Sequence, residues 1–408
     1  MRILLAAEGF SAARPQDAGR WLGELAVRLT HRGHRVTAVL SRVDEDDSAA
    51  DPPGVAVWRP GTESADALLR RALDQRPDVV HLAAPGPWSE PTLRALADAP
   101  LVLDALDFWP LCAAGDLVRR PRLEACPHQH GFEGCGECAG HSHVRAMEAR
   151  APRGREARGV IAHTAAARDR LEAGLRRAVD CIRPGLDPLV FSPSPEAPQA
   201  PEIAALLRTP RPPRVLVLGD GGPHRGAPSL ADLLVALHAR VPGVELVILS
   251  DGDPDDAPPL VLAEARELGL AAQVLAVRDL AREDEPALVA ACDVACVPGP
   301  LAPTGGLRVM EALSAGLPVV AHAGGAIGEL VTHGAEGVLV PADPIGGFAH
   351  AVAALLRDPG ARAEYAGRAR LAALERFDVD RAVYAHEEVY LRARRRPRRP
   401  DTEGQQAA

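Results

Sequence analysis

The chain has 408 residues, which is long for a single hydrophobic core and suits two domains. Apolar residues make up 47% of it and charged residues 25%, values typical of a globular protein in water. The formal net charge of −9 excludes a general attraction to nucleic acid. All 46 basic side chains are arginine, which excludes chemistry that needs a lysine, such as a pyridoxal Schiff base or a P-loop phosphate contact.

No stretch of the sequence approaches the roughly 20 apolar residues that a membrane span needs. The apolar run at residues 2–7 is too short for a signal peptide and predicts a buried first strand. We therefore expect a cytoplasmic protein, in which the seven cysteines are reduced or metal-bound rather than paired.

The N-terminal half alternates predicted strands with predicted helices. After the strand at 2–7, apolar residues at helical spacing lead to Gly33, which ends the first helix. Further strands are expected at 36–40, 78–82, 101–103, 159–163 and 179–182, and helices near 65–73 and 90–97. This alternation predicts a parallel sheet covered by helices on both faces.

A proline-rich segment, residues 191–213, predicts a linker that carries a short helix near 202–208. The second half then repeats the alternation, with strands expected at 214–219, 244–250, 294–297, 318–321 and 337–340. The expected units are an N-terminal domain at 1–190, a second domain at 214–376 and a C-terminal helix at 377–392. Two doubly wound α/β domains of this kind place their strand ends, and any ligand, in the cleft between them.

The last segment, residues 393–408, is predicted to be a disordered basic tail. Six arginines occupy the eight positions from 392 to 399, and a polar end follows. A solvated tail is the preferred interpretation. Weak electrostatic contact with an anionic membrane surface is the alternative.

Three runs in the second half carry a family resemblance. Residues 293–311 read DVACVPGPLAPTGGLRVME, residues 312–344 read ALSAGLPVVAHAGGAIGELVTHGAEGVLVPADP, and residues 356–380 read LRDPGARAEYAGRARLAALERFDVD. They resemble the nucleotide-sugar-binding domain of the retaining GT-B glycosyltransferases of family 4 (group 1). In that family a strand ending in Pro precedes a Glu-x7-Glu segment, and an Ala-x-Gly-x-Pro-Val-Val strand follows.

The first half fits the same family more loosely, through RGHRVTAVL, RPDVVHL, GVIAHT and RPGLDPLVF. The resemblance implies a GT-B fold, in which two Rossmann-like domains face each other. It also implies transfer of a sugar, with retention, from a nucleotide-sugar donor to an unknown small-molecule, glycan or lipid acceptor.

The resemblance places the donor site around residues 304–311. Thr304, Gly305 and Gly306 precede a predicted helix that begins at Leu307, where close backbone amides and the helix dipole suit a diphosphate. Glu311 is the last Glu of the family motif, which implies a hydrogen bond to the nucleotide ribose. A Thr-capped helix with a solvated Glu311 is the structural alternative.

Two further segments complete the predicted donor-binding set. Gly324, Gly325 and Glu329 follow a predicted strand, and the matching loop lines the donor pocket in the family; an ordinary strand-to-helix turn is equally compatible with the sequence. Gly219 and Arg225 belong to LGDGGPHRG, in which Arg225 can hold the diphosphate bidentately. The predicted catalytic residues are Arg225, Glu311 and Asp107.

Four sites depart from the family pattern. The first Glu of Glu-x7-Glu falls at Pro303, the Arg of a Gly-Arg pair at Asp220, and the His of a Thr-x-His-Asp segment at Leu106. The Gly-Gly pair before the first helix is Gln16-Asp17. Loss of a preorganised cation beside a developing charge costs about 3–4 kcal/mol of barrier. A transferase is preferred; a catalytically degenerate scaffold protein and an epimerase-like enzyme of the same architecture are the alternatives.

A cysteine-rich insertion at 112–143 predicts a metal site. Its spacing Cys135-x2-Cys138 lets two thiolates share one tetrahedral zinc. A closed structural zinc site is expected, with free thiols and a His-ligated catalytic zinc as alternatives, and no catalytic metal is expected. The predicted ligands are Cys112, Cys126, Cys135 and Cys138. The other three cysteines, Cys181, Cys292 and Cys296, are expected in the core.

Three further side chains lie next to the predicted cleft. His81 and His163 end apolar strands, so each is either a structural histidine or a sugar contact. Trp109, close to Asp107, can stack on a sugar or fill the core.

Overall fold

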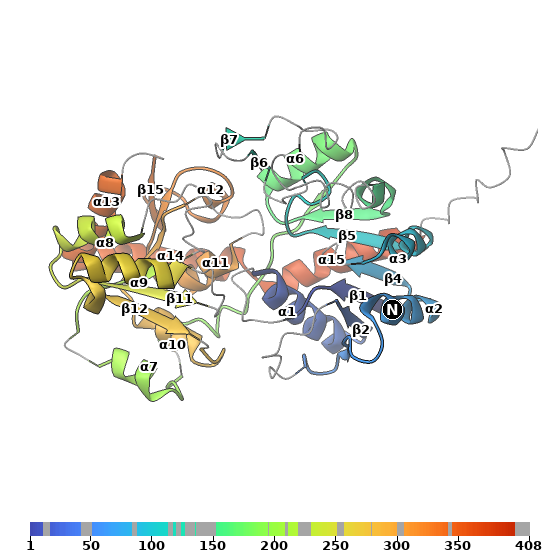
Figure 1. Cartoon of the computed structure of the whole chain (residues 1–408), viewed down its shortest axis with the longest axis horizontal. Coiled ribbons are helices and arrows are strands. Elements are labelled where there is room, and N and C mark those ends of the chain that lie inside the picture. The colour runs from blue at the N-terminus through green and yellow to red at the C-terminus, as the bar shows by residue number, and fades with distance from the viewer. Residues whose placement is uncertain are drawn as a thin grey trace, which may run out of the picture.

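Two parallel sheets organise the chain, one in each half, and the two domains lie side by side (Figure 1). The structure is a computed structural model. It describes residues 1–10, 17–41, 51–83, 88–112, 117–119, 124–126, 135, 152–194, 196–208, 211–218, 230–250, 257–278, 280–299, 306–341 and 345–395. Within these residues, no helix combines the length and the apolar character that crossing a bilayer would take.

The N-terminal sheet has seven parallel strands in the order β3-β2-β1-β4-β5-β8-β9. The strands are β1 (Arg2–Ala7), β2 (Arg35–Leu40), β3 (Ala56–Trp58), β4 (Val79–Leu82), β5 (Leu101–Ala105), β8 (Gly159–Ala162) and β9 (Asp180–Cys181). The helices between them include α1 (Asp17–His31), α2 (Ala65–Asp74), α3 (Glu90–Ala95) and α6 (Ala165–Leu175). One apolar cluster packs α1 on the sheet and a second packs α2, α3 and α6, so the sheet is covered on both faces.

The second sheet has six parallel strands in the order β12-β11-β10-β13-β14-β15. The strands are β10 (Arg214–Val217), β11 (Glu245–Ser250), β12 (Val274–Arg278), β13 (Val294–Val297), β14 (Val319–His322) and β15 (Gly337–Val340). The helices of this half include α8 (Leu230–His238), α9 (Ala257–Glu267), α10 (Glu285–Ala290), α11 (Leu307–Ser314), α12 (Ile327–Leu330), α13 (Ile345–Arg357) and α14 (Pro359–Arg376). The strand order reverses between β10 and β13, the position at which doubly wound sheets bind ligands. A small antiparallel pair, β6 (Val118–Arg119) and β7 (Glu124–Ala125), lies in the insertion of the first half.

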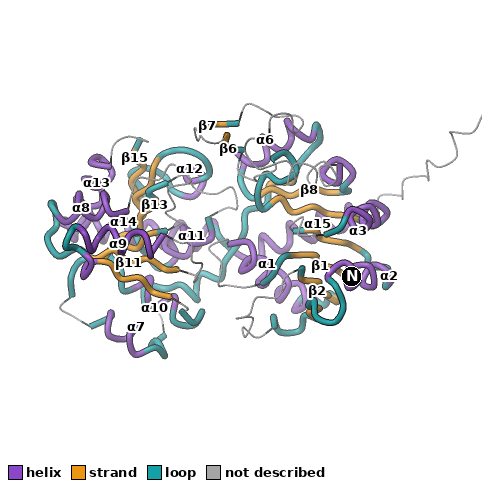
Figure 2. The backbone as a smooth tube through the Cα atoms, viewed as in Figure 1, coloured by secondary structure: helices purple, strands orange, loops and turns teal. Residues whose placement is uncertain are grey.

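The chain crosses between the domains twice, and the two crossings touch. The first leads to the linker helix α7 (Pro201–Leu206), and the second leads into α15 (Val379–Arg395), which returns to pack on the N-terminal domain (Figure 2). The amide of Leu186 donates a hydrogen bond to the carbonyl of Phe377 at 2.9 Å. A Cβ on Gly185 would lie 2.4 Å from Cα of Val379, so glycine is needed for this approach.

The predicted fold class is confirmed: both halves are parallel α/β domains of Rossmann-like type. The first helix ends before Gly33, whose φ of 83° is left-handed as expected. Trp109 fills the core and is 3% exposed, which decides between its two interpretations. The C-terminal helix runs on to Arg395, and the predicted tail beyond it lies outside the described residues.

Candidate functional site

Three neighbouring strands of the second sheet bring the predicted donor segments to one edge. β10, β13 and β14 are parallel neighbours, so the segments that follow them leave from the same side of the sheet. Gly219 follows β10, Gly306 follows β13, and Gly324 follows β14. Four predicted residues, Gly219, Arg225, Thr304 and Gly305, lie outside the described residues, and their roles stay predictions.

Helix α11 is fixed at this edge by its first residues. Gly306 precedes it with φ 68° and ψ 51°, and its carbonyl accepts hydrogen bonds from the amides of Val309 (3.0 Å) and Met310 (3.1 Å). This left-handed conformation is cheap for glycine. The Leu307 side chain packs into the domain core, and Glu311, one turn further on, is only 3% exposed. The carboxylate of Glu311 is therefore held in one place.

Glu311 belongs to a ring of four alternating charges, which we call the charge ring: Arg20, Glu311, Arg308 and Glu285. Nη2 of Arg20 lies 3.0 Å from Oε1 of Glu311 and donates to Oε2 of Glu285 at 2.6 Å. Nη1 of Arg308 lies 3.7 Å from Oε2 of Glu311 and donates to Oε2 of Glu285 at 3.1 Å. Arg20 comes from α1 of the N-terminal domain, whereas the other three belong to the second domain.

The charge ring is almost closed to water, since the side chains of Arg20, Glu285 and Glu311 are 1%, 4% and 4% exposed. Charges buried to this degree need partners, and the ring supplies two of each sign. The ribose-binding residue implied by the family resemblance is therefore electrostatically tied to the opposite domain.

Glu329 makes a second polar contact between the domains. Its carboxylate accepts hydrogen bonds from the amides of Ala165 (2.8 Å) and Ala166 (3.0 Å), and Nη2 of Arg183 lies 3.5 Å away. Those amides open α6, so Glu329 caps a helix of the other domain and meets the positive end of its dipole. In this arrangement Glu329 contacts protein, and its donor-binding role stays a prediction.

The loop before Glu329 has the backbone of a tight turn. Gly324 and Gly325 have φ values of 140° and 57°, which glycine tolerates and other residues rarely adopt. Both are exposed, and a Cβ on Gly324 would meet nothing within 4 Å. The turn itself accounts for both glycines, and a role in donor binding stays a prediction.

Asp107 follows β5 in the N-terminal domain. Its Oδ1 accepts a hydrogen bond from the backbone amide of Trp109 at 2.7 Å, which makes a local turn. The side chain is half-buried, and its predicted catalytic role stays a prediction.

His81 and His163 belong to a fully buried group in the N-terminal domain, the histidine cluster, together with Asp104, His386 and Tyr390. Nε2 of His163 lies 2.7 Å from Oδ1 of Asp104, and Nδ1 donates to the carbonyl of Ile182 at 2.8 Å. The Ile182 carbonyl can only accept, so Nδ1 of His163 carries a proton, and Nε2 faces the Asp104 carboxylate. The Asp104 carboxylate raises the pKa of His163 against the lowering effect of burial, and the two histidines His163 and His81 hold the pKa of Asp104 well below its ordinary range.

The remaining members of the histidine cluster come from β4 and α15. Nε2 of His81 lies 3.2 Å from Oδ2 of Asp104, and its Nδ1 pairs with the Tyr390 hydroxyl at 2.8 Å. Nδ1 of His386 donates to the carbonyl of Ala382, and burial lowers the pKa of His386 to about 4, so this ring is neutral. All these side chains are inaccessible to solvent. The structural interpretation of both histidines is favoured, because His81 ties α15 to the sheet through Tyr390 and the buried His163 pairs with Asp104 and the carbonyl of Ile182.

The predicted zinc ligands are only partly described. Cys112 and Cys135 are buried and Cys126 is half-buried, while Cys138 lies outside the described residues. Among the residues that the structure describes, no group of three or more His, Cys, Asp or Glu side chains is placed to hold a metal ion. The zinc site stays a prediction.

The core prediction for the other cysteines is wrong at one position. Cys181 is exposed because it lies on β9, the edge strand of its sheet. Cys292 and Cys296 are buried as expected, and burial raises the pKa of the Cys292 thiol to about 12.

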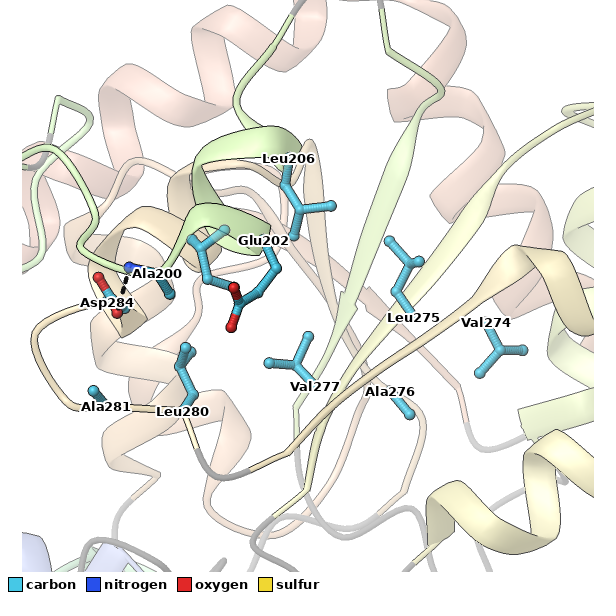
Figure 3. A pocket seen from close by; sticks show the side chains of 11 residues that line it. Ala200, Glu202, Leu206, Val274, Leu275, Ala276, Val277, Leu280, Ala281 and Asp284 are labelled. Atoms are coloured by element: carbon cyan, nitrogen blue, oxygen red, sulfur yellow. Dashed lines mark hydrogen bonds between the residues drawn. The ribbon is translucent and has the colours of Figure 1, made fainter.

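A pocket of about 610 Å³ lies at the outer edge of the second domain, between α7 and the edge strand β12 (Figure 3). Its walls are mostly apolar, with Glu202 directed into it. The Asp284 carboxylate on its rim accepts hydrogen bonds from the amides of Gln199 (2.6 Å) and Ala200 (3.1 Å), which ties the linker to the domain. Of the predicted donor residues that the structure describes, none lines this pocket.

Sequence reasoning missed three of the four members of the charge ring: Arg20, Glu285 and Arg308. A weak signal existed for Arg20, since it directly precedes Trp21 and Leu22 on the apolar side of α1. Its partners lie 265 and 291 positions further along the chain, so no local pattern could reveal them.

Each half of the chain matches a model of a known protein family. A family model described as Glycosyltransferase Family 4 matches residues 18–190, and one described as Glycosyl transferases group 1 matches residues 212–358. In solved structures, Anabaena HepE in complex with UDP and glucose superimposes with a TM-score of 0.69 at 22% identity, covering 95% of this chain and 98% of HepE. The chain has the GT-B glycosyltransferase fold. WaaG, a glycosyltransferase involved in lipopolysaccharide biosynthesis, shares this GT-B fold with a TM-score of 0.65 at 18% identity, covering 95% and 99% of the two chains.

At the level of sequence, the chain is also similar to curated glycosyltransferases. A D-inositol 3-phosphate glycosyltransferase of Mycobacterium sp. (strain JLS) is 33% identical over 180 residues, which are 44% of this chain and 39% of that protein. The match thus spans about two fifths of the relative's length.

Proposed function

We propose that this GT-B protein transfers a sugar, with retention, from a nucleotide-sugar donor to an acceptor hydroxyl. The observation that carries the proposal is the placement of Glu311. It is buried and held by ion pairs on the first helix after β13, at the reversal of strand order, where its carboxylate can accept hydrogen bonds from ribose hydroxyls.

The amino end of α11 supplies the second element of the proposed donor site. A helix start combines backbone amides with the positive end of a dipole, and both favour a diphosphate. In the proposed reaction the acceptor oxygen bonds to the anomeric carbon while the bond from that carbon to the phosphate oxygen breaks. The acceptor proton passes to the departing phosphate on the same face, so the protein supplies position and charge rather than a nucleophile.

Within this proposal Arg225 offsets the charge of the leaving diphosphate, and Asp107 lies on the acceptor side. The donor class is supported by HepE, whose complex holds UDP and glucose. The acceptor is left open, because the curated relative matches over only part of its length.

A degenerate transferase that acts as a scaffold is the second candidate. The specific observation in its favour is that the two acidic residues predicted to bind donor, Glu311 and Glu329, both contact the N-terminal domain. The substitutions at Pro303 and Asp220 point the same way.

Binding of nucleoside diphosphates separates the two candidates. Purified protein is titrated with UDP, GDP and ADP by calorimetry, and the diphosphate that binds is then tested as its sugar conjugate for donor hydrolysis. Glu311→Gln should weaken binding about tenfold or more, because a charged acceptor is lost. The matched control Glu375→Gln, an exposed position on α14, should bind as wild type. Wild-type protein that binds none of the three diphosphates would contradict the transferase proposal and favour the scaffold.

We also propose that Cys112, Cys126, Cys135 and Cys138 hold a structural zinc. Four thiolates suit tetrahedral zinc, which would tie the insertion together. Elemental analysis of purified protein should give about one zinc per chain. Folded protein free of zinc would contradict this proposal.

A further inference from the structure

We propose that Arg20 is a positioning residue of the donor site, which reaches across the domain boundary to hold the Glu311 carboxylate in place for the nucleotide ribose. This inference rests on the proposed function, since it takes Glu311 to be the ribose acceptor. Its consequence is that nucleotide affinity depends on contact between the two domains.

The charge count within the second domain is the first argument. Among the residues that the structure describes, that domain brings two carboxylates, Glu285 and Glu311, and one guanidinium, Arg308, to the same buried place. A buried carboxylate without a matching cation is expensive. Arg20 adds a second positive charge from the other domain, so the charges of the four described ring members balance.

Geometry is the second argument. A single nitrogen of Arg20, Nη2, lies between the two carboxylates, 2.6 Å from Glu285 and 3.0 Å from Glu311. The opposite side of the Glu311 carboxylate faces Arg308 at 3.7 Å, which is too long for a hydrogen bond. Arg20 therefore makes the shorter of these two contacts with Glu311 and fixes the direction of Oε1.

The way Arg20 is held is the third argument. Its side chain is 1% exposed, and it lies on the 15-residue helix α1 beside Trp21, which is also 1% exposed and buried in the domain core. An arginine anchored in this way moves together with the N-terminal domain, so its distance from Glu311 depends on the position of that domain. A carboxylate accepts up to four hydrogen bonds, so contact with Arg20 does not by itself exclude hydrogen bonds from ribose hydroxyls.

The coupling is reciprocal by thermodynamic necessity. If contact with Arg20 strengthens the binding of the nucleotide to Glu311, the bound nucleotide strengthens the contact between the domains by the same factor. The bound donor would thereby favour the arrangement in which the N-terminal domain, which carries the proposed acceptor side, contacts the second domain.

The test compares four variants by calorimetric titration with the nucleoside diphosphate that wild-type protein binds best among UDP, GDP and ADP. Arg20→Met should weaken binding about tenfold, because Glu311 loses the ion pair that holds Oε1 at 3.0 Å. Arg20→Met combined with Glu285→Gln restores a neutral pair, Arg308 with Glu311, and should recover most of the lost affinity. Glu285→Gln alone should change affinity less than Arg20→Met.

The matched control is Arg28→Met, on the same helix two turns further on. Arg28 pairs with Glu24 at 2.8 Å and Asp187 at 3.2 Å, outside the charge ring. Its loss should leave nucleotide affinity within about twofold of wild type, since its ion pairs are partly exposed to water and lie away from Glu311.

A ribose analogue separates positioning from general damage. The 2′,3′-dideoxy form of the same diphosphate lacks the hydroxyls that Glu311 would accept, so Arg20→Met should bind it as well as wild type does. If Arg20→Met weakens the analogue equally, or if its affinity for the normal diphosphate is unchanged or higher, the inference is wrong while the proposed function stands. A double variant that folds but does not recover nucleotide affinity would also overturn the inference. Wild-type protein that binds no diphosphate would overturn the proposed function as well.

Discussion

The charge ring and the histidine cluster are both buried and both balance opposite charges, yet they lie in different parts of the molecule. The histidine cluster is contained in one domain, between its sheet and α15. The charge ring spans two domains, and one of its four members comes from the far side. Helix α1 contacts both groups through adjacent residues. Arg20 belongs to the charge ring, and the indole of Trp21 lies 5.5 Å from the imidazole of His386 in the histidine cluster.

This difference teaches what each group can control. A cluster inside one domain is complete whenever that domain is folded, so it contributes to stability. A ring across a boundary is complete only when the domains are in contact, so it can couple domain position to a ligand. The following predictions test this division of roles.

The largest expected effect is that of Asp104→Ala. Removing this carboxylate takes away the buried anion that faces both His163 and His81, and breaking a buried ion pair costs about 3–5 kcal/mol of unfolding free energy. Urea unfolding monitored by circular dichroism measures the loss. A combined Asp104→Leu and His163→Leu variant should recover part of it, because an apolar pair needs no charge balance. A loss below about 1 kcal/mol, the range of an ordinary surface substitution, would contradict this role.

A pH effect of about 3 kcal/mol is expected from His386, whose folded-state pKa of about 4 lies below its ordinary value of 6.5. Between these values the unfolded chain binds a proton that the folded chain refuses. Stability should therefore fall as the pH is lowered from 6.5 to 4. The raised pKa of His163 acts in the opposite sense, with stability present below pH 6.5 and lost as the pH rises through its folded pKa.

The His386→Leu variant isolates this effect, because the contributions of His163 and Asp104 are common to both proteins. Unfolding free energies at pH 7, 6, 5 and 4 should fall less steeply for the variant than for wild type. Parallel curves would show that His386 is not buried in its neutral form.

A smaller effect is expected for Glu329→Ala, which removes the contact that caps α6 from the opposite domain. Loss of a helix cap costs about 0.5–2 kcal/mol, or a few degrees in melting temperature. Glu329→Gln keeps an acceptor oxygen and should lose less. If both variants have the melting temperature of the wild type, this interdomain contact does not form in solution.

The smallest effect is that of Tyr390→Phe, which removes the hydroxyl paired with His81 and keeps the ring shape. We expect a loss of about 1 kcal/mol, the usual net value of one hydrogen bond. Nucleotide affinity, measured on the same preparation, should not change. A change in affinity would contradict the separation between the stabilising cluster and the ligand-coupled ring.

Much of the architecture could be predicted from local pattern. The first strand, the end of α1 before Gly33 and the parallel type of both sheets follow from apolar runs and turn residues, and the structure confirms them. Cys181 shows where such patterns fail, because a strand at the edge of a sheet has the same local sequence as one inside it.

The candidate site was predictable only in part. Glu311 stands out through its motif, and its helix begins where expected. His81 and His163 were left with two interpretations, and both prove to be fully buried; His81 pairs with Tyr390 of α15, 309 positions further along the chain. Burial of this kind is a property of packing between distant segments, which no single stretch of sequence contains.

The sequence by itself determined two α/β domains, the family they resemble and the helix that carries Glu311, because apolar periodicity and turn chemistry act over a few neighbouring residues. Tertiary structure alone decided that Arg20 joins Glu311 and that Asp104 lies between two histidines. Charges in a nearly dry interior must be paired, and the partners that satisfy them are chosen by how whole domains and helices pack.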